Sequence, residues 1–591
     1  MDLKTITFNN ALFSCSNTDP IKGANSSESL GNLGSEVIKT VAAASNELKL
    51  DQDVNNIQLI KVENSQITLF LNDAEHSQVT YSLEPNLSKQ LSNSQFEIKR
   101  DLLGEKILEL SKKQEVKNLY LYSSGGGGHK SAKDAEVERD FENLMNQVKA
   151  EIENETMNIN VELNPEEIEK SQSLINDERL KDPTKFIEWC KQMGLIEDVD
   201  VLHDYLGKVG KWASDQWDNA QIEADVEKQE SLASKQWLSD IFFGPVIFIS
   251  TLRSLIQFKP KKLVSTQAMA TPSILLAVKV YNSFFKPKED PAILLNLYMT
   301  DMPTEYATHF FNSIKRIATG QEFLKLHTPK PQEEIDWKEL CGLNNDQVVE
   351  LDVKDLPVRR AFLKAVDEYK PDLEHPSVEI KVRNKEDLNI LHDVLKHQGD
   401  SDCKLGDLTT PTNESQYINY SMKPEDKGTF IMLGSQPTLV AIQDYIKEYI
   451  ELARENPNTN YHFFAVTKTT SYKALCEFIT NQPDWPSNLR VVPLTYQEPK
   501  QLISLEMMCD TITRSGGGSI MELLVLNEVI KKIPNYPTRN RYIHAQPVKG
   551  RSLEESIAVW EKGNFFFFHK AVTSAKVVDP RSIRSAIAAS A

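Results

Sequence analysis

The sequence predicts an α/β fold made of two similar units. Short apolar strands alternate with helical segments over most of the chain, which is typical of parallel sheets covered by helices. The order strand, glycine-rich turn, helix occurs twice, near residues 116–132 and 507–524. A chain of 591 residues is also too long for one hydrophobic core, which favours two or three domains.

Residues 1–105 form an N-terminal extension that we expect to be partly β. Apolar and polar residues alternate between 57 and 83, in I-Q-L-I-K-V and Q-I-T-L-F-L, and this pattern predicts a small antiparallel sheet. The first α/β domain is expected at 106–356. Its strands are predicted at 116–122, 157–163, 261–267 and 292–301, with a charged helical insertion at about 164–240.

The longest apolar stretch, residues 237–256, contains Asp240, Pro245 and Arg253. These residues disfavour a membrane span, so we expect a buried helix. The alternative is a helix that contacts a membrane from one side and ends in the basic K-P-K-K of 259–262.

The second α/β domain is expected at 357–575, followed by a C-terminal tail at 576–591. An irregular, polar insertion occupies about 363–427. The segments that follow predict a strand at 429–436, a helix at 439–454 and strands at 461–467 and 489–494. A short strand, a glycine turn and a helix then fill 507–524.

Composition limits the partners. A net charge of −18 argues against nucleic acid, which requires a basic surface. The six cysteines lack the spacing of a metal site or a disulfide framework, and the N-terminus has no apolar stretch of signal-peptide length. We therefore expect a cytoplasmic protein.

The first glycine run, S-S-G-G-G-G-H-K-S-A at 123–132, is not a standard nucleotide loop. Ser124 and His129 stand where a P-loop requires glycine, and Lys130 stands where a dinucleotide loop requires its last glycine. The run is either a flexible turn or a place where a ligand approaches the backbone closely. In the second case His129, at the start of a helix, is a candidate general base.

The second run, R-S-G-G-G-S-I-M-E at 514–522, predicts an anion site at a helix N-terminus. The amides of Gly516–Gly518 and Ser519 would meet a diphosphate, and Glu522 would accept hydrogen bonds from a ribose diol. The alternative is an ordinary helix-entry turn with a solvated glutamate.

These motifs resemble those of GT-B glycosyltransferases. The most similar branch contains the monogalactosyldiacylglycerol synthases and the enzyme that adds N-acetylglucosamine to the lipid-linked peptidoglycan precursor. The resemblance covers about 116–362 and 428–570. The motifs, in family order, are S-S-G-G-G-G-H, V-S-T-Q (264–267), Thr300-Asp301, P-V-R-R-A-F (357–362), Gly434-Ser435-Gln436 and R-S-G-G-G-S-I-M-E.

The resemblance implies two Rossmann-like domains that face a cleft, with the acceptor on the N-terminal side and a nucleotide sugar, UDP-linked, on the C-terminal side. His129 would be the general base for the acceptor or a transition-state contact. Asp301 is either a carboxylate in the cleft that assists His129 or a turn residue at a strand end. The residues implied to bind the donor are Gly126, Gly127, Gly128, Gly434, Ser435, Gln436, Arg514, Ser515, Gly516, Gly517, Gly518, Ser519, Glu522, Arg539, Asn540 and Arg541.

Two departures from the family pattern bear on these assignments. Pro437 replaces a glycine after the Gly-Ser-Gln turn, and the segment after Pro534 does not match the donor-sugar loop. Arg539 and Arg541 could therefore belong to a solvated loop instead. No metal-binding D-x-D is evident, because D-V-D at 198–200 lies in the predicted helical insertion and is expected to be a solvated loop.

The implied activity is an inverting, metal-independent hexosyltransferase. It would use a nucleotide-diphosphate sugar as co-substrate, without a cofactor, and a hydroxyl of a lipid, glycan or protein as acceptor. Residues 237–262 could make a peripheral membrane contact for a lipid acceptor, although the net charge of −18 opposes attraction to anionic lipid. The N-terminal region and the insertions, which lie outside the resemblance, favour a different acceptor such as a protein. The alternatives are an epimerase or hydrolase acting on a nucleotide sugar, and a catalytically silent protein that binds one.

Overall fold

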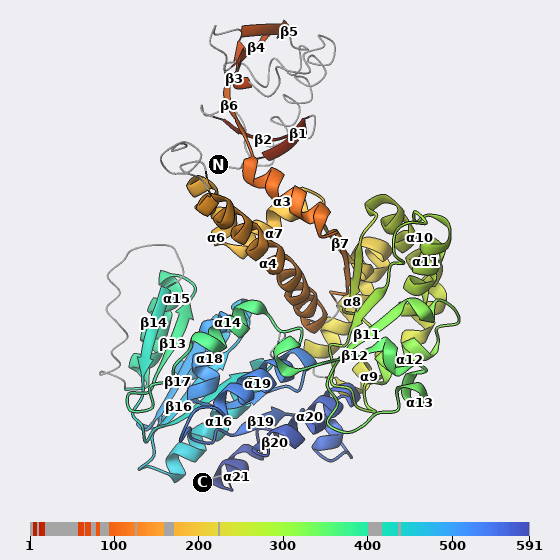
Figure 1. The fold of residues 1–591 in the computed structure, drawn as a ribbon. Coiled ribbons are helices and arrows are strands. Elements are labelled where there is room, and N and C mark those ends of the chain that lie inside the picture. Colours follow the sequence, from red (N-terminus) through yellow and green to blue (C-terminus); the bar gives the residue numbers. More distant parts are fainter. Residues whose placement is uncertain are drawn as a thin grey trace. The chain divides into compact units, whose positions relative to one another are not determined.

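The computed structural model describes most of the chain, in two compact units. The described residues are 4–8, 11–17, 57–63, 66–71, 78–82, 94–124, 127–158, 171–222, 225–399, 416–434 and 439–589. Unit 1 comprises Met1–Val116 and Phe141–Trp189, and unit 2 comprises Lys117–Asp140 and Cys190–Ala591. Figure 1 labels their elements.

Unit 1 contains a six-stranded antiparallel sheet in the order β1-β2-β6-β3-β4-β5. Its strands are β1 (Lys4–Phe8), β2 (Ala11–Asn17), β3 (Ile57–Glu63), β4 (Gln66–Leu71), β5 (Gln78–Ser82) and β6 (Ser94–Arg100). Helix α3 (Leu102–Lys113) follows. Asp101 caps α3 by accepting a hydrogen bond from Gly104 N at 3.0 Å, and it forms an ion pair with Arg179 at 2.8 Å. This ion pair joins α3 to α6 (Glu178–Lys181).

The first sheet of unit 2 has six parallel strands in the order β12-β11-β10-β9-β7-β8. The strands are β7 (Asn118–Tyr122), β8 (Ile196–Asp200), β9 (Lys262–Ser265), β10 (Leu295–Tyr298), β11 (Leu324–Pro329) and β12 (Val348–Leu351). The strand order reverses at β7, so a crevice is expected at the carboxyl ends of β7 and β9.

The helices of unit 2 that follow these strands are the π-helix η2 (Val201–Tyr205), α8 (Leu206–Ile222), α9 (Val226–Ser234), α10 (Gln236–Phe258), α11 (Thr271–Phe284), α12 (Thr308–Lys315) and α13 (Trp337–Cys341). Helix α4 (Gly127–Asn158) begins in unit 2 and continues into unit 1, and most of α7 (Pro183–Gln192) belongs to unit 1. A buried apolar cluster lies between the sheet and α10, α11 and α12. This packing keeps the strand ends of the sheet in fixed positions.

The predicted insertion 164–240 is not wholly helical, because it contains the edge strand β8. D-V-D is therefore part of a strand, not of a solvated loop, and Asp198 forms ion pairs with Lys133 at 3.2 Å and Lys191 at 2.6 Å. The acidic residues of β8 mask its strand pattern in the sequence. Of the strand predicted at 157–163, the first two residues end α4 and the rest lie outside the described residues.

The second sheet of unit 2 is also parallel, with the order β17-β16-β15-β18-β19-β20. Its strands are β15 (Lys427–Met432), β16 (Tyr461–Val466), β17 (Leu489–Leu494), β18 (Asp510–Thr513), β19 (Arg541–His544) and β20 (Ala575–Val578). In chain order this is 3-2-1-4-5-6, the Rossmann order, with its switch point between β15 and β18. The two sheets confirm the predicted fold class of two Rossmann-like α/β domains.

The helices of the second domain are α14 (Arg360–Glu368), α15 (Lys385–His397), α16 (Leu439–Glu455), α17 (Thr469–Thr480), α18 (Pro499–Met508), α19 (Gly517–Ile530), α20 (Val559–Ala571) and α21 (Ile583–Ala588). The predicted insertion 363–427 contains α15 and an antiparallel pair, β13 (Ser377–Val382) with β14 (Gln416–Ser421). Residues 576–591 do not form the separate tail that we expected. Strand β20 pairs with β19 in the sheet, and α21 packs on α16 and β20.

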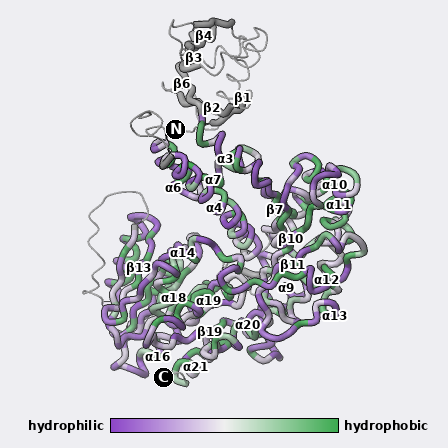
Figure 2. The backbone as a smooth tube through the Cα atoms, in the orientation of Figure 1, coloured by the Kyte–Doolittle hydropathy of each residue, from purple (hydrophilic) through white to green (hydrophobic). Residues whose placement is uncertain are grey.

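Helix α10 is less buried than the sequence suggested. Only 22% of the apolar window Asp240–Phe258 is buried, although the window is long and apolar enough to cross a membrane. Ile241, Phe242 and Ile249 are 61%, 70% and 63% exposed, and Figure 2 shows the hydrophobic colouring of this helix. The expectation of a buried helix is therefore wrong for one face of α10. We call Ile241, Phe242, Val246 and Ile249 the α10 apolar face.

Candidate functional site

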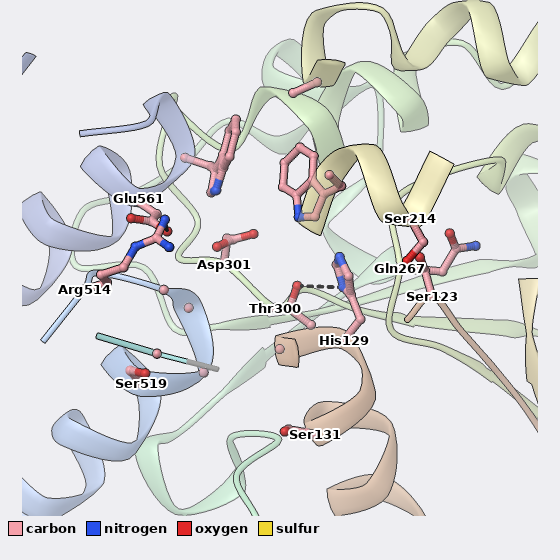
Figure 3. A pocket seen from close by; sticks show the side chains of 18 of the residues that line it. Ser123, His129, Ser131, Ser214, Gln267, Thr300, Asp301, Arg514, Ser519 and Glu561 are labelled. Carbon is pink, nitrogen blue, oxygen red and sulfur yellow. Dashed lines mark hydrogen bonds and ion pairs between the residues drawn. The ribbon is translucent and has the colours of Figure 1, made fainter. Parts of the chain in front are cut away.

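Unit 2 contains a pocket of about 960 Å³ between the carboxyl ends of its two sheets. His129 lies after β7, Thr300 after β10, Gly434 after β15 and Gly516 after β18, and all four line the pocket. Figure 3 shows the labelled side chains converging on this space. Both topological switch points therefore open into the same cavity, which is where α/β sheets bind ligands.

The two glycine turns meet in this pocket. A Cβ placed on Gly518 would lie 4.0 Å from the Cα of Gly128, so the starts of α19 and α4 are neighbours. A Cβ on Gly517 would lie 1.7 Å from the carbonyl oxygen of Thr300, which is far inside van der Waals contact. Only glycine allows this approach of the second domain to the strand end of the first.

The surroundings of His129 fix its tautomer. Its Nδ1 lies 2.6 Å from the carbonyl oxygen of Thr266 and 3.2 Å from the hydroxyl of Thr300. A carbonyl can only accept, so Nδ1 carries the proton and Nε2 keeps the lone pair. Burial lowers the pKa of His129 below the ordinary 6.5, against the opposing charge of Asp301. The ring is therefore a neutral base at pH 7.

Asp301 lines the pocket but does not bond His129 directly. Its carboxylate accepts hydrogen bonds from His309 Nε2 at 3.1 Å and from Asn564 Nδ2 at 2.7 Å. Burial raises the pKa of Asp301, but the hydrogen bond and charge interaction with His309, the hydrogen bond from Asn564 and the charge interaction with His129 together hold the pKa below its ordinary value. Asp301 thus acts on His129 through its charge, and the sequence did not reveal His309 and Asn564 as its partners.

Glu522 lines the C-terminal side of the pocket and is held by the linker between the domains. Arg359 donates to its Oε1 from Nε at 2.8 Å and also forms an ion pair with it through Nη2. The buried Glu506 lies nearby. Burial, and next the charge of Glu522, raises the pKa of Glu506 to about 8. Arg359 thus holds Oε1 of Glu522 at the wall of the pocket.

The amino end of α19 offers hydrogen-bond donors to the pocket. Gly516 is its N-cap residue and provides no side-chain hydrogen bond to the first backbone N–H groups of the helix. Arg514 lies beside this turn and forms an ion pair with Glu561 at 2.7 Å. Figure 3 shows the two side chains next to each other. A helix N-terminus with a neighbouring guanidinium can receive a diphosphate.

The other half of the pocket is apolar, which the sequence did not indicate. Its wall comes from η2, α8, α9 and α10, and the apolar residues are Leu202, Leu206, Val209, Trp212, Ala213, Trp217, Leu232, Ala233 and Phe243. The ring of Trp217 also packs against the ring of Trp560 from the second domain, with 5.4 Å between the ring centroids and an angle of 31° between the ring planes. The helical insertion therefore forms an apolar wall of the pocket that also holds His129.

Several predicted residues are not brought to the pocket. Asn540 bonds Asp510, and the buried Arg541 donates to the backbone of Glu506. Arg539 and Asn540 precede β19, and Arg541 is its first residue. All three therefore lie at the amino end of the sheet, opposite the glycine turns. Their assignment to the donor site is thereby corrected.

The remaining predicted residues divide into three groups. Gly127 begins α4, and Gly128, Gly434, Arg514, Gly516–Gly518, Ser519 and Glu522 line the pocket. Ser515 is fully buried behind the turn. Gly126, Ser435 and Gln436 lie outside the described residues. Within the part of the chain that the structure describes, no group of three His, Cys, Asp or Glu side chains could hold a metal ion.

Replacement of Gly517 by alanine should force the two domains apart, because the added Cβ would meet the Thr300 backbone. We expect a loss of about 1–3 kcal/mol in the free energy of unfolding, measured by urea denaturation. Gly516→Ala is the matched control: a Cβ there meets no atom within 4 Å, and φ is −62°. Equal stability of the two variants would contradict the close contact.

No family model and no curated protein matches this chain. Among solved structures, MurG from Acinetobacter baumannii is similar with 11% identity and a TM-score of 0.30, over 58% of this chain and 68% of that one. The rhamnosyltransferase SpnG, complexed with thymidine diphosphate, is similar with 11% identity and a TM-score of 0.29, over 68% and 80%. A UDP-GlcNAc 2-epimerase from Methanocaldococcus jannaschii shares 12% identity, with a TM-score of 0.30, over 58% and 74%.

Proposed function

We propose that this protein is an inverting glycosyltransferase that moves a sugar from a nucleotide-diphosphate sugar to a hydroxyl acceptor. One observation carries the proposal: two glycine turns at facing strand ends enclose a pocket that also holds a neutral histidine base. The motif resemblance in the sequence points to the same reaction. The proposed reaction does not require a metal ion.

The donor would lie along the second domain. Glu522 Oε2 would accept a hydrogen bond from a ribose hydroxyl, while Arg359 holds Oε1. The backbone amides at the start of α19 would bind the diphosphate. Arg514, beside the same turn, would balance the charge that develops as the diphosphate leaves.

The chemical step is a single displacement. The acceptor oxygen forms a bond to the anomeric carbon while the bond from that carbon to the diphosphate oxygen breaks. His129 Nε2 takes the acceptor proton, and the ionised Asp301 stabilises the imidazolium that results. The products are the glycosylated acceptor, with inverted configuration, and the nucleoside diphosphate.

We further propose that the α10 apolar face docks on a membrane and that the acceptor is a lipid. Trp212, 62% exposed, belongs to both the pocket wall and the exposed surface, and Val209 beside it is 48% exposed. The pocket wall also includes Phe243, next to the exposed Phe242. An apolar path of this kind suits an acceptor with a hydrocarbon chain better than a glycan or a protein hydroxyl.

Nucleotide sugars should raise the melting temperature of the protein. A donor at 100 times its Kd stabilises the native state by about 2.7 kcal/mol. UDP-glucose, UDP-galactose and UDP-N-acetylglucosamine are the probes. Glu522→Ala should weaken the binding about tenfold or more, because it removes a charged acceptor, whereas Glu528→Ala, an exposed residue of the same helix paired with Lys531, should not.

The three functional alternatives separate in the same samples. Nucleotide released only when a hydroxyl acceptor is present supports transfer. Sugar conversion or release without an acceptor identifies an epimerase or hydrolase, and a melting shift without turnover identifies a silent binder. Absence of any shift would reject all three.

His129→Gln should lower kcat by a factor of about 10²–10⁴ while the donor still raises the melting temperature. In the unmodified protein, the rate should fall on the acid side as the imidazole becomes protonated. Because burial lowers the pKa of His129, that fall should lie below pH 6.5. His375→Gln, an exposed residue, serves as the control. Unchanged turnover in His129→Gln would refute the base assignment.

Vesicle binding tests the membrane contact. Ile249→Glu and Phe242→Glu should each reduce co-sedimentation with phosphatidylcholine vesicles several-fold, since each places a charge in the apolar layer. Val440→Glu, on an equally exposed apolar residue of α16, should have no effect. The net charge of −18 means that anionic vesicles should bind no better than neutral ones. Equal binding by all variants would speak against docking through α10.

A further inference from the structure

Asn564 connects the two halves of the site at a point that no sequence motif marks. It lies on α20 and is fully buried. Its Oδ1 accepts a hydrogen bond from Met302 N at 2.7 Å, and its Nδ2 donates to Asp301 Oδ1 at 2.7 Å and to the Ser515 carbonyl at 2.9 Å. The oxygen and the NH2 group of the side-chain amide thus both take part in hydrogen bonds.

The partners leave one orientation for this amide. Met302 N–H can only donate, while the Asp301 carboxylate and the Ser515 carbonyl can only accept. An amide supplies one acceptor and two donors from one planar group, which no other side chain of this size does. Met302 and Asp301 follow β10 in the first domain, and Ser515 belongs to the glycine turn in the second.

The packing around α20 supports a fixed position for Asn564. A Cβ on the preceding residue, Gly563, would lie 2.3 Å from Thr304 Oγ1 and 2.8 Å from Tyr306 Cβ. The helix therefore lies directly against the segment that follows Asp301. Because α20 belongs to the second domain, this contact and the hydrogen bonds of Asn564 hold both strand ends together.

We propose that Asn564 is a positioning residue for transfer: it locks the Asp301 carboxylate and the turn that receives the diphosphate into one rigid unit. This role rests on the proposed function. Asp301 then keeps its charge at a set distance from His129, while the α19 amides keep their place at the leaving group. The pocket also presents His309, Arg514 and Glu561 to the same space, so the placement of each charge matters.

Asn564→Ala should lower kcat about 100-fold, because a small misplacement of reacting groups costs about that much. The Kd of the donor should change by about threefold or less, since Glu522 and the α19 amides remain. The readout is UDP release from whichever of the three UDP-sugars stabilises the unmodified protein. The control is Asn488→Ala, which removes another three-bond asparagine, to the carbonyls of Ala453, Asn456 and Thr459, away from the pocket. It should lose stability but keep kcat.

Asn564→Asp tests the geometry independently of turnover. It would place a second carboxylate against Asp301, and two carboxylates in one site share a proton because the pKa of the pair is raised. A carboxyl group whose pKa is raised on folding destabilises the protein as pH rises. The melting temperature of this variant should therefore fall between about pH 5 and pH 8, more than that of the unmodified protein. The double variant Asp301→Asn/Asn564→Asp has a single carboxylate at this place, so its melting temperature should no longer show the additional fall with pH. It should still be inactive, because the carboxylate is then on residue 564 and no longer on residue 301.

The outcomes separate the claims. Full kcat in Asn564→Ala, or an equal kcat loss in Asn488→Ala, would overturn the positioning role. So would an Asn564→Asp variant whose melting temperature does not depend on pH. Absence of UDP release by the unmodified protein would overturn the proposed function, and with it this role for Asn564.

Discussion

The contact between Gly517 and the Thr300 backbone is the constraint on which the site depends. It exists because residue 517 has no side chain, and it brings the amino end of α19 against the strand end that carries Asp301. His129, Asp301 and Glu522 come from segments nearly four hundred residues apart. Without this approach they would face solvent on separate domains, and the pocket would lose its shared wall.

Hydrogen bonds near this contact fix the state and position of the polar side chains that line the pocket. A backbone carbonyl sets the tautomer of His129, and burial keeps the ring neutral. Arg359 holds one oxygen of Glu522 in place at the pocket wall. In the proposed reaction, His129 removes the acceptor proton, while the α19 amides and Arg514 support the leaving diphosphate.

The sequence predicted the parts of the site that depend on local pattern. Glycine turns after apolar strands revealed both halves of the pocket, because a strand that leads through glycine into a helix has few other uses. It failed where tertiary packing decides. The acidic strand β8 lacks an apolar pattern, and Arg541 lies at the wrong end of its strand to reach the donor side. His309 meets Asp301 because α12 begins close to the end of β10, and Asn564 meets it only because α20 packs on the first domain.

A comparison of UDP with uridine tests the central claim most directly. If the amide groups at α19 receive the diphosphate, calorimetry should show that UDP binds about tenfold or more tightly than uridine, with one site per chain. Equal affinities would place the binding energy in the nucleoside alone, and no UDP binding would leave the glycine turns without a ligand; either result would contradict the account.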